Sequence, residues 1–222
     1  MIYQDYKNIL FLFFFLTGGG GIRAQDTMPP EKPVLRYVTV DTAYNDYVNI
    51  YWEKSPSLDV IRYRLYYEVK TINGYEGVKF DSVPASNNSY THNTSGLAGK
   101  QPILYSVSAV DAAGNESTRK PGLHGSIHST VTYDSCLSTL TLRWTKYQGW
   151  GNNVSGYFVF ESIGNGSFQI IEGKNANDTF LIINDVPENK QYSFFVEGVN
   201  FNTLKSASNI VSKFTYMPLP PE

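Results

Sequence analysis

The chain has 222 residues, a formal net charge of −2 and only 17% charged residues. Charge this close to neutral excludes the basic footprint of a nucleic-acid-binding protein and gives no attraction to anionic lipid. The aromatic content of 15%, with 17 tyrosines, favours β-strands over helices.

The N-terminal segment reads as an export signal. Its apolar run of eight residues, Ile9–Leu16, is shorter than the roughly 20 residues that a membrane-spanning helix needs, and small residues follow it. We expect cleavage after Ala24, which leaves about 195 residues, enough for two sandwich domains of roughly 100 residues each. Because Lys7 is offset by Asp5 and Ile22 is large for its position before the cleavage site, a retained membrane anchor is the alternative. With the signal removed, the mature chain has no membrane span and is extracellular or at the cell surface.

The first repeat follows a proline-rich lead and predicts a series of antiparallel strands. The clearest strand is 61–69, and its residues divide between two faces. One face has Ile61, Tyr63, Leu65, Tyr67 and Val69, and the other has Arg62, Arg64 and Glu68. The remaining strands predicted in this repeat are 34–41, 47–53, 78–83, 89–93 and 103–110, with a tight turn at Asn73–Gly74.

The second repeat has the same design. Trp144 is the inward residue of a short alternating strand, as Trp52 is in the first repeat, and each is followed by a tyrosine-bearing strand with Tyr157 or Tyr63. The strands predicted in this repeat are 140–145, 157–161, 168–171, 179–183 and 192–198.

The segment 109–117, together with Trp52 and Tyr63, resembles the F–G hairpin region of a fibronectin type III domain. The resemblance covers roughly residues 29–121. In the second repeat, Tyr192 resembles the tyrosine corner of the family, whose hydroxyl bonds backbone near the E–F turn. The first repeat has Ile103 at that place and so lacks the corner hydroxyl.

This resemblance implies an all-β chain of two consecutive immunoglobulin-like (fibronectin type III) β-sandwiches of seven strands each. The expected plan is a signal peptide at 1–25, a proline-rich lead at 26–33, domain 1 at 34–121, a linker at 122–127, domain 2 at 128–216, and a proline-rich linker or tail at 217–222.

The loop 147–153, with Cys136 ahead of it, resembles a loop in gliding-motility-associated surface proteins of the Bacteroidetes. That resemblance implies a secreted array of fibronectin-like repeats exported by the type IX system. The sorting domain of those proteins is absent from this sequence. The tail 217–222 has the composition of a polyproline-type linker, so we expect the chain to be part of a longer multidomain protein.

Cys136 is the single cysteine, so an internal disulfide is excluded and the apolar core must supply the stability. In an extended strand, Cys136 would be an even number of residues from Leu140 and Leu142 and so on the same face. This predicts an inward or edge position near the A–B turn and a buried, inert thiol. A reactive or intermolecular thiol is the alternative.

Motifs for catalysis, metal and cofactor binding are missing from the sequence. There is no Gly-x-Ser-x-Gly elbow, no His-Glu-x-x-His, no calcium loop of alternating aspartates and no phosphate-binding glycine loop. His124 and His128, with Cys136, have a metal-binding spacing only on a helix, and Pro121 and Gly122 place them in a linker. We expect no enzyme activity, no metal and no cofactor.

Two aromatic residues, Tyr147 and Trp150, are the predicted contact residues, since an aromatic side chain in a Gly/Asn-rich loop can stack on a sugar or anchor a protein interface. The alternative is that Trp150 folds back over the end of its sandwich or against the other domain. Six Asn-x-Ser/Thr sequons are glycan sites in a eukaryotic secretory protein and otherwise reflect polar turns: Asn87, Asn93, Asn115, Asn153, Asn165 and Asn177.

These features predict a non-enzymatic, exported spacer or adhesion module of a bacterial cell-surface protein, which mediates or positions protein or glycan contacts. The alternative is an accessory carbohydrate-binding module of a secreted hydrolase. A eukaryotic receptor ectodomain is a third possibility, although the Arg-Gly-Asp and Trp-Ser-x-Trp-Ser signatures are missing. The partner is a protein or polysaccharide at the cell surface, with no nucleic acid. The gene sequence beyond Glu222 would distinguish these three interpretations. A sorting domain there would indicate the surface protein, a catalytic domain the hydrolase, and an apolar 20-mer the receptor.

Overall fold

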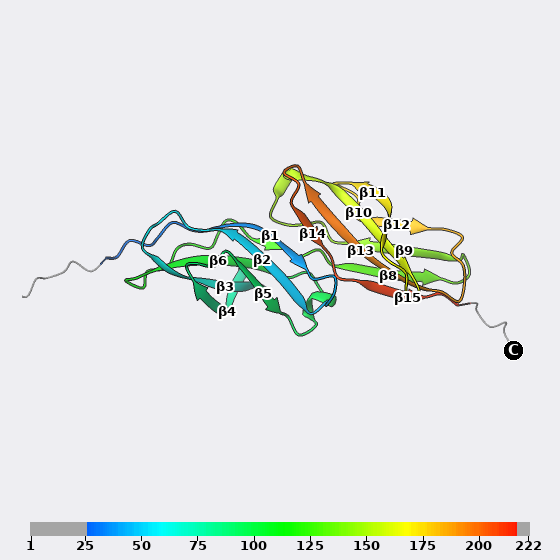
Figure 1. Cartoon of the computed structure of the whole chain (residues 1–222), viewed down its shortest axis with the longest axis horizontal. Helices are drawn as coiled ribbons and strands as arrows, with labels where there is room; N and C mark the ends of the chain where they lie inside the picture. The colour runs from blue at the N-terminus through cyan, green and yellow to red at the C-terminus, as the bar shows by residue number, and fades with distance from the viewer. Residues whose placement is uncertain (1–25, 217–222) are drawn as a thin grey trace, which may run out of the picture.

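The computed structural model describes residues 26–216 and consists of two antiparallel β-sandwiches that follow one another along the long axis (Figure 1). The predicted signal peptide at 1–25 and the predicted tail at 217–222 lie outside the described residues. Within residues 26–216, no helix has the length and hydropathy to cross a membrane.

The first sandwich has a three-stranded sheet packed on a four-stranded one. The first sheet has the order β1-β2-β5 and the second the order β4-β3-β6-β7. Their strands are β1 (Val34–Val40), β2 (Tyr47–Glu53), β3 (Val60–Thr71), β4 (Gly74–Pro84), β5 (Ser89–Asn93), β6 (Leu104–Asp111) and β7 (His124–Gly125), with a 3₁₀ turn η1 (Leu97–Gly99) before β6.

The second sandwich repeats this arrangement, with its last strand divided into two pieces. One sheet has the order β12-β9-β8; the other has the order β11-β10-β13-β14, and β15 also pairs with β13. Their strands are β8 (Ser129–Asp134), β9 (Thr139–Trp144), β10 (Val154–Ile163), β11 (Gln169–Asn175), β12 (Phe180–Ile183), β13 (Gln191–Asn200), β14 (Lys205–Ala207) and β15 (Val211–Phe214), with a 3₁₀ turn η2 (Gly151–Asn153) before β10. The predicted fold class of two consecutive immunoglobulin-like sandwiches is confirmed.

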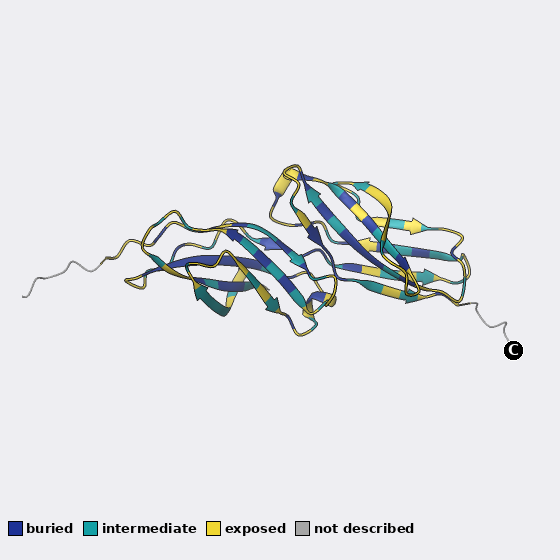
Figure 2. Ribbon diagram, viewed as in Figure 1, coloured by how far each residue is buried: buried dark blue, intermediate teal, exposed yellow. Residues whose placement is uncertain are grey.

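The two predicted core tryptophans occupy equivalent positions near the ends of β2 and β9. Trp52 is 2% exposed and Trp144 is 4% exposed. Each indole packs against the predicted tyrosine of the following strand, with ring centroids 5.6 Å apart for Trp52 and Tyr63 and 5.9 Å apart for Trp144 and Tyr157. Figure 2 shows buried positions alternating mainly with partly exposed ones along these strands, which follows from the period of two in their sequences.

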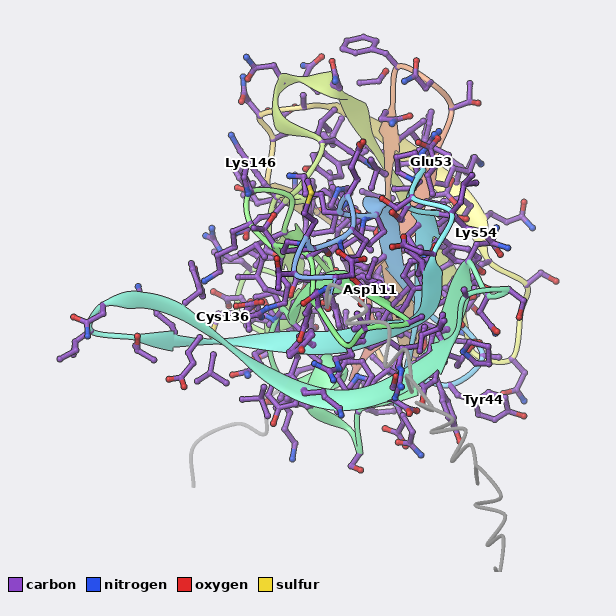
Figure 3. The ribbon with its side chains drawn as sticks, turned by 90° about the vertical axis from the view of Figure 1, so that its left-hand side faces the viewer. Tyr44, Glu53, Lys54, Asp111, Cys136 and Lys146 are labelled. Carbon is purple, nitrogen blue, oxygen red and sulfur yellow. The ribbon has the colours of Figure 1, made fainter. Side chains whose placement is uncertain are left out.

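The predicted alternation along β3 holds only from Tyr63 to Leu65. Ile61 is 43% exposed beside an irregularity in the pairing of β3 with β6 between Val60 and Arg62. The pairing of β3 with β4 is irregular between Leu65 and Tyr66, and beyond this point Glu68 is buried while Val69 is 44% exposed. A β-bulge shifts the side-chain alternation, and the far part of the β3–β4 hairpin projects sideways from the rest of the molecule (Figure 3). Period-two reasoning therefore assigned Glu68 and Val69 to the wrong environments.

The prediction that Cys136 is inward and buried is wrong, because this residue is exposed in the turn between β8 and β9. The carboxylate of Asp134 accepts hydrogen bonds from the backbone N–H groups of Cys136 and Leu137, at 2.9 and 3.1 Å. Ser138 has a φ of 49°, so the chain reverses its direction before β9 begins. The strand alternation that places Leu140 and Leu142 inward therefore ends at this turn and does not apply to Cys136.

The segment 122–127, predicted as a linker, is partly built into the sandwiches. β7 pairs with β6 through Leu104 and Gly125, and Ile127 is fully buried in the core. Only residues 126–128 separate β7 from β8. A connection this short brings the end of one sandwich against the beginning of the next.

The tyrosine corner of the second sandwich is weaker than the resemblance implies. The Tyr192 hydroxyl lies 3.5 Å from the carbonyl oxygen of Pro187, which also accepts a hydrogen bond of 2.9 Å from the Thr215 hydroxyl. We expect Tyr192→Phe to lower the free energy of unfolding by no more than about 1 kcal/mol, because the carbonyl retains its second donor. The comparison is Thr215→Val, which removes the stronger donor and is expected to cost about 1–3 kcal/mol. Urea unfolding of both variants would measure the two losses. A larger loss in Tyr192→Phe than in Thr215→Val would contradict this expectation.

Candidate functional site

The predicted contact residues Tyr147 and Trp150 lie between the two domains. They are 5% and 7% exposed, and their rings stack with centroids 3.8 Å apart. The structure therefore has the stated alternative, in which Trp150 folds against the other domain. The loop between β9 and β10 is at the end of the second sandwich that faces the first, where an aromatic pair fills the space between the domains.

Hydrogen bonds from this loop reach the backbone of β1 in the first domain. The indole Nε1–H of Trp150 donates to the Arg36 carbonyl oxygen at 2.9 Å. The hydroxyl of Tyr147 accepts from the Val38 backbone N–H at 3.0 Å. The loop thus satisfies polar groups of β1 that would otherwise be buried without partners.

A second set of contacts joins β1 and the loop after it to the segment 206–210. The Ser206 hydroxyl donates to the Val38 carbonyl oxygen at 2.7 Å, and the Ala207 N–H donates to the Thr39 hydroxyl at 2.8 Å. The side-chain amide of Asn45 bonds both the carbonyl and the N–H of Ile210, at 2.8 and 2.7 Å. We use the term domain joint for the loop 147–150 and the segment 206–210 of the second domain, together with the residues of β1, of the loop after it and of β7 that they contact. Its hydrogen bonds come from two separate segments of the second domain, 147–150 and 206–210, so the relative position of the domains is defined at several points.

His124, which the sequence placed in a linker, is part of the domain joint. Its Nδ1 lies 2.8 Å from the Tyr147 hydroxyl. Among residues 26–216, the other partner of that hydroxyl is the Val38 N–H, which is a donor, so the imidazole is the one acceptor for the hydroxyl proton. We therefore assign His124 as the neutral tautomer with its proton on Nε2. Burial lowers the pKa of His124 from 6.5 to about 4, which agrees with a neutral ring at pH 7.

Acid is expected to weaken the domain joint through His124. The folded chain binds this proton less readily than the unfolded chain, so the free energy of unfolding falls as the pH drops from 6.5 towards about 4 and then levels off. The loss reaches about 3 kcal/mol at the lower limit. Urea unfolding at a series of pH values measures it.

His124→Asn, which keeps a hydrogen-bond acceptor but does not titrate, should remove most of this pH dependence. The matched control is His128→Asn, because His128 is half-buried and its Nε2 has only a 3.3 Å contact with the Gly99 carbonyl oxygen. The burial of His92 also lowers its pKa, so part of the slope should persist in both variants. An unchanged slope in His124→Asn would contradict the assignment.

A cleft of about 530 Å³ lies beside the domain joint. The first domain contributes β3, η1 and the start of β6, and the second contributes the beginning of the β9–β10 loop. Tyr75, 41% exposed, gives the wall an accessible aromatic ring. Its lining includes the polar side chains of Glu68, Lys70, Gln101, Ser126, Thr145, Lys146 and Gln148. The cleft therefore offers hydrogen-bonding groups and an aromatic surface.

Glu68 is the most deeply buried charge of the cleft. Its Oε1 accepts from the Ser106 hydroxyl at 2.5 Å and from Arg119 at 2.7 Å, while its Oε2 lies 3.6 Å from the Lys120 ammonium. The guanidinium of Arg119 also lies over the Tyr66 ring, 4.2 Å from its centroid. Among residues 26–216, Oε2 has no hydrogen-bond partner, so the buried carboxylate is held through Oε1 and by the two nearby cations.

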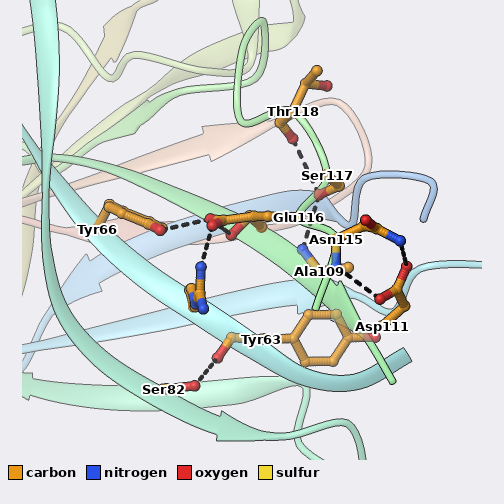
Figure 4. Close-up of polar contacts among 11 residues, drawn as sticks. Tyr63, Tyr66, Ser82, Ala109, Asp111, Asn115, Glu116, Ser117 and Thr118 are labelled. Atoms are coloured by element: carbon orange, nitrogen blue, oxygen red, sulfur yellow. Dashed lines mark hydrogen bonds and ion pairs between the residues drawn. The ribbon is translucent and has the colours of Figure 1, made fainter. Parts of the chain in front are cut away.

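A related polar network covers the outer face of β3 and β6 (Figure 4). Glu116 accepts from the hydroxyls of Tyr66 and Ser108, at 2.6 and 2.5 Å, and pairs with Arg64. Burial raises the pKa of Glu116, but these hydrogen bonds and the Arg64 charge lower it more, so the net shift is downward. The network ties the segment after β6 to the sheet.

Three carboxylates, from Asp26, Asp59 and Asp111, have ligand atoms within 4.8 Å of one another. Oxygen ligands of this kind suit a divalent cation. However, both oxygens of the buried Asp111 already accept from Asn115, from its backbone N–H at 2.8 Å and its side-chain amide at 2.9 Å. We assign no ion to this cluster.

Sequence reasoning missed His124 and the segment 206–210, which with the loop 147–150 make the joint. Pro121 and Gly122 are typical of a linker, so the short strand β7 at His124 was not predicted. The segment 206–210 has a run of small polar residues that reads as a loop, although Ser206, Ser208 and Asn209 are all fully buried or nearly so. The one available signal was the short connection between the repeats, because domains with little linker must contact each other.

No protein-family model matches the chain, and no curated protein matches it. Among solved structures, the chain is similar to a central fibronectin-III array of RIM-binding protein, with 14% identity, a TM-score of 0.34, and coverage of 87% of this chain and 71% of that chain. The FN1–FN3 domains of chicken CNTN1 have 13% identity and a TM-score of 0.34, with 85% and 68% covered. A two-domain fibronectin type-III segment from chicken tenascin has 16% identity and a TM-score of 0.30, with 82% and 98% covered. The fold assignment rests on the strand order and pairing described above.

Proposed function

We propose that this chain is a non-enzymatic, exported module that holds contacts at a defined spacing on a bacterial cell surface. In its finer form, the proposal places the chain in the repeat region of a gliding-motility-associated protein secreted by the type IX system. The domain joint carries the proposal, because it combines a buried aromatic pair with hydrogen bonds from two separate segments of the second domain. A spacer must transmit position and load, and a joint of this kind resists bending better than a free linker.

The spacing role is tested by the distance between the far ends of the two domains. Leu58 and Leu137 are 102% and 69% exposed, so both tolerate a spin label on a cysteine in a Cys136→Ser background. We expect one narrow distance distribution by pulsed electron spin resonance, and a broad one after Trp150→Ala. A broad distribution in the parent chain would contradict a fixed spacing.

Carbohydrate binding is the second candidate, and the cleft beside the domain joint is the observation that favours it. Tyr75 offers a partly exposed ring, and the amides of Gln101 and Gln148 can bond hydroxyl groups. Retention of the chain on polysaccharide gels would support this function if Tyr75→Ala removed it while Tyr44→Ala did not. Tyr44 is 67% exposed and is not among the lining residues of the cleft. Equal retention of both variants would exclude the cleft.

A further inference from the structure

The strand β11 is an open sheet edge in the second domain. It lies at one end of the order β11-β10-β13-β14, and within residues 26–216 no strand pairs with its other side. Six of its seven residues are exposed, as Figure 2 shows at the upper edge of this sandwich. Such an edge presents unpaired N–H and C=O groups that can pair with another strand.

The corresponding edge of the first domain is better protected. The strand β4 ends in Pro84, which cannot donate a ladder hydrogen bond. In contrast, β11 has no proline, and its residues Ile170 and Ile171 are 57% and 37% exposed. Of these two edges, β11 is therefore the one suited to pairing.

The charges of β11 are complementary to those of a second copy of the same strand. If two copies pair antiparallel with Gly173 opposite Gly173, Glu172 of each copy lies opposite Lys174 of the other. The two side chains share one face, because the Lys174 ammonium lies 3.6 Å from Glu172 Oε1 within the chain. Centring the pair on Glu172 or on Lys174 instead opposes like charges, which destabilises a sheet. The register around Gly173 is thus selected by charge.

The residues around Gly173 also suit a two-fold axis. Phe158 is its neighbour on β10, and the Phe158 ring lies 3.7 Å from the place where a Cβ of Gly173 would be. That ring is 40% exposed. With glycine at the axis, the Phe158 rings of two copies can approach each other over the paired strands and bury apolar surface that one copy leaves in water.

We propose that two copies of this chain associate through β11, antiparallel about a two-fold axis at Gly173, to form one continuous sheet across both second domains. The contact is isologous, because the same strand serves both partners. A single strand pair is a small interface, so association in solution is weak and gains strength where many copies stand on one surface. Self-association goes beyond the spacing role, and its absence would leave that role intact.

Charge exchange tests the proposal by sedimentation velocity of the purified full chain at concentrations up to several hundred micromolar. We expect the parent chain to dimerise, and both Glu172→Lys and Lys174→Glu to weaken dimerisation by about tenfold or more, because each opposes like charges twice. An equimolar mixture of the two variants should regain the parent affinity as a heterodimer, and so should the double exchange in one chain. A monomeric parent, unaffected single variants, or a mixture that fails to associate would each overturn the proposal.

A cysteine at the axis gives an independent readout of the register. In a Cys136→Ser background, Gly173→Cys places two thiols directly opposite each other, within the Cα separation that a disulfide spans. Gly173 has no positive φ and a Cβ there makes an ordinary contact, so the fold should tolerate the change. The control Asn175→Cys is also exposed, but its two thiols would be roughly 13 Å apart. Mild oxidation should crosslink Gly173→Cys at least about tenfold faster, and equal rates would refute this register.

Discussion

Trp150→Ala is expected to lower the free energy of unfolding by about 3–5 kcal/mol, as large truncations in cores do. The indole is 7% exposed, stacks on Tyr147 and donates to the Arg36 carbonyl oxygen. Its removal leaves a cavity between the domains and an unpaired carbonyl on β1. Thermal unfolding should therefore change from one cooperative transition to two, as the domains lose their coupling.

Trp150→Phe is the control for the hydrogen bond alone. It keeps most of the apolar ring and loses the donor to Arg36, so we expect a loss of about 1–2 kcal/mol. Differential scanning calorimetry measures both variants. A change under about 0.5 kcal/mol in Trp150→Ala would show that this residue behaves as a surface position and would contradict its assignment to the domain joint.

Trp52→Ala and Trp144→Ala should each cost about 3–5 kcal/mol, with the loss confined mainly to the domain that carries the change. Both indoles are nearly inaccessible and pack edge-on or tilted against a buried tyrosine. Guanidinium unfolding followed by near-UV circular dichroism would measure the losses.

Phenylalanine variants sharpen this comparison. The Nε1–H groups of Trp52 and Trp144 have no hydrogen-bond partner among residues 26–216, whereas that of Trp150 has one. Trp52→Phe and Trp144→Phe lose apolar contacts but no hydrogen bond, so each should cost clearly less than its alanine counterpart. A phenylalanine variant as damaging as the alanine one would contradict the assignment of these residues to apolar packing.

Local patterns determined the strands and the core. The predicted strand 47–53 has the bounds of β2, and 89–93 has those of β5, because alternation with a period of two and flanking turn residues are properties of short segments. The same patterns placed Trp52, Tyr63, Trp144 and Tyr157 inside. They failed at Val69 and Cys136, where a bulge and a turn interrupt the alternation.

The position of one domain against the other was decided only by the tertiary structure. An aromatic residue in a Gly/Asn loop has the same local signature whether it meets solvent, a ligand or a neighbouring domain. Trp150 and Tyr147 became buried because the short connection at 126–128 brings β1 and His124 over their loop. The pairing of Asn45 with Ile210 likewise joins residues far apart in the chain. Contacts of this kind depend on the packing of whole domains, so no periodicity within either segment could have predicted them.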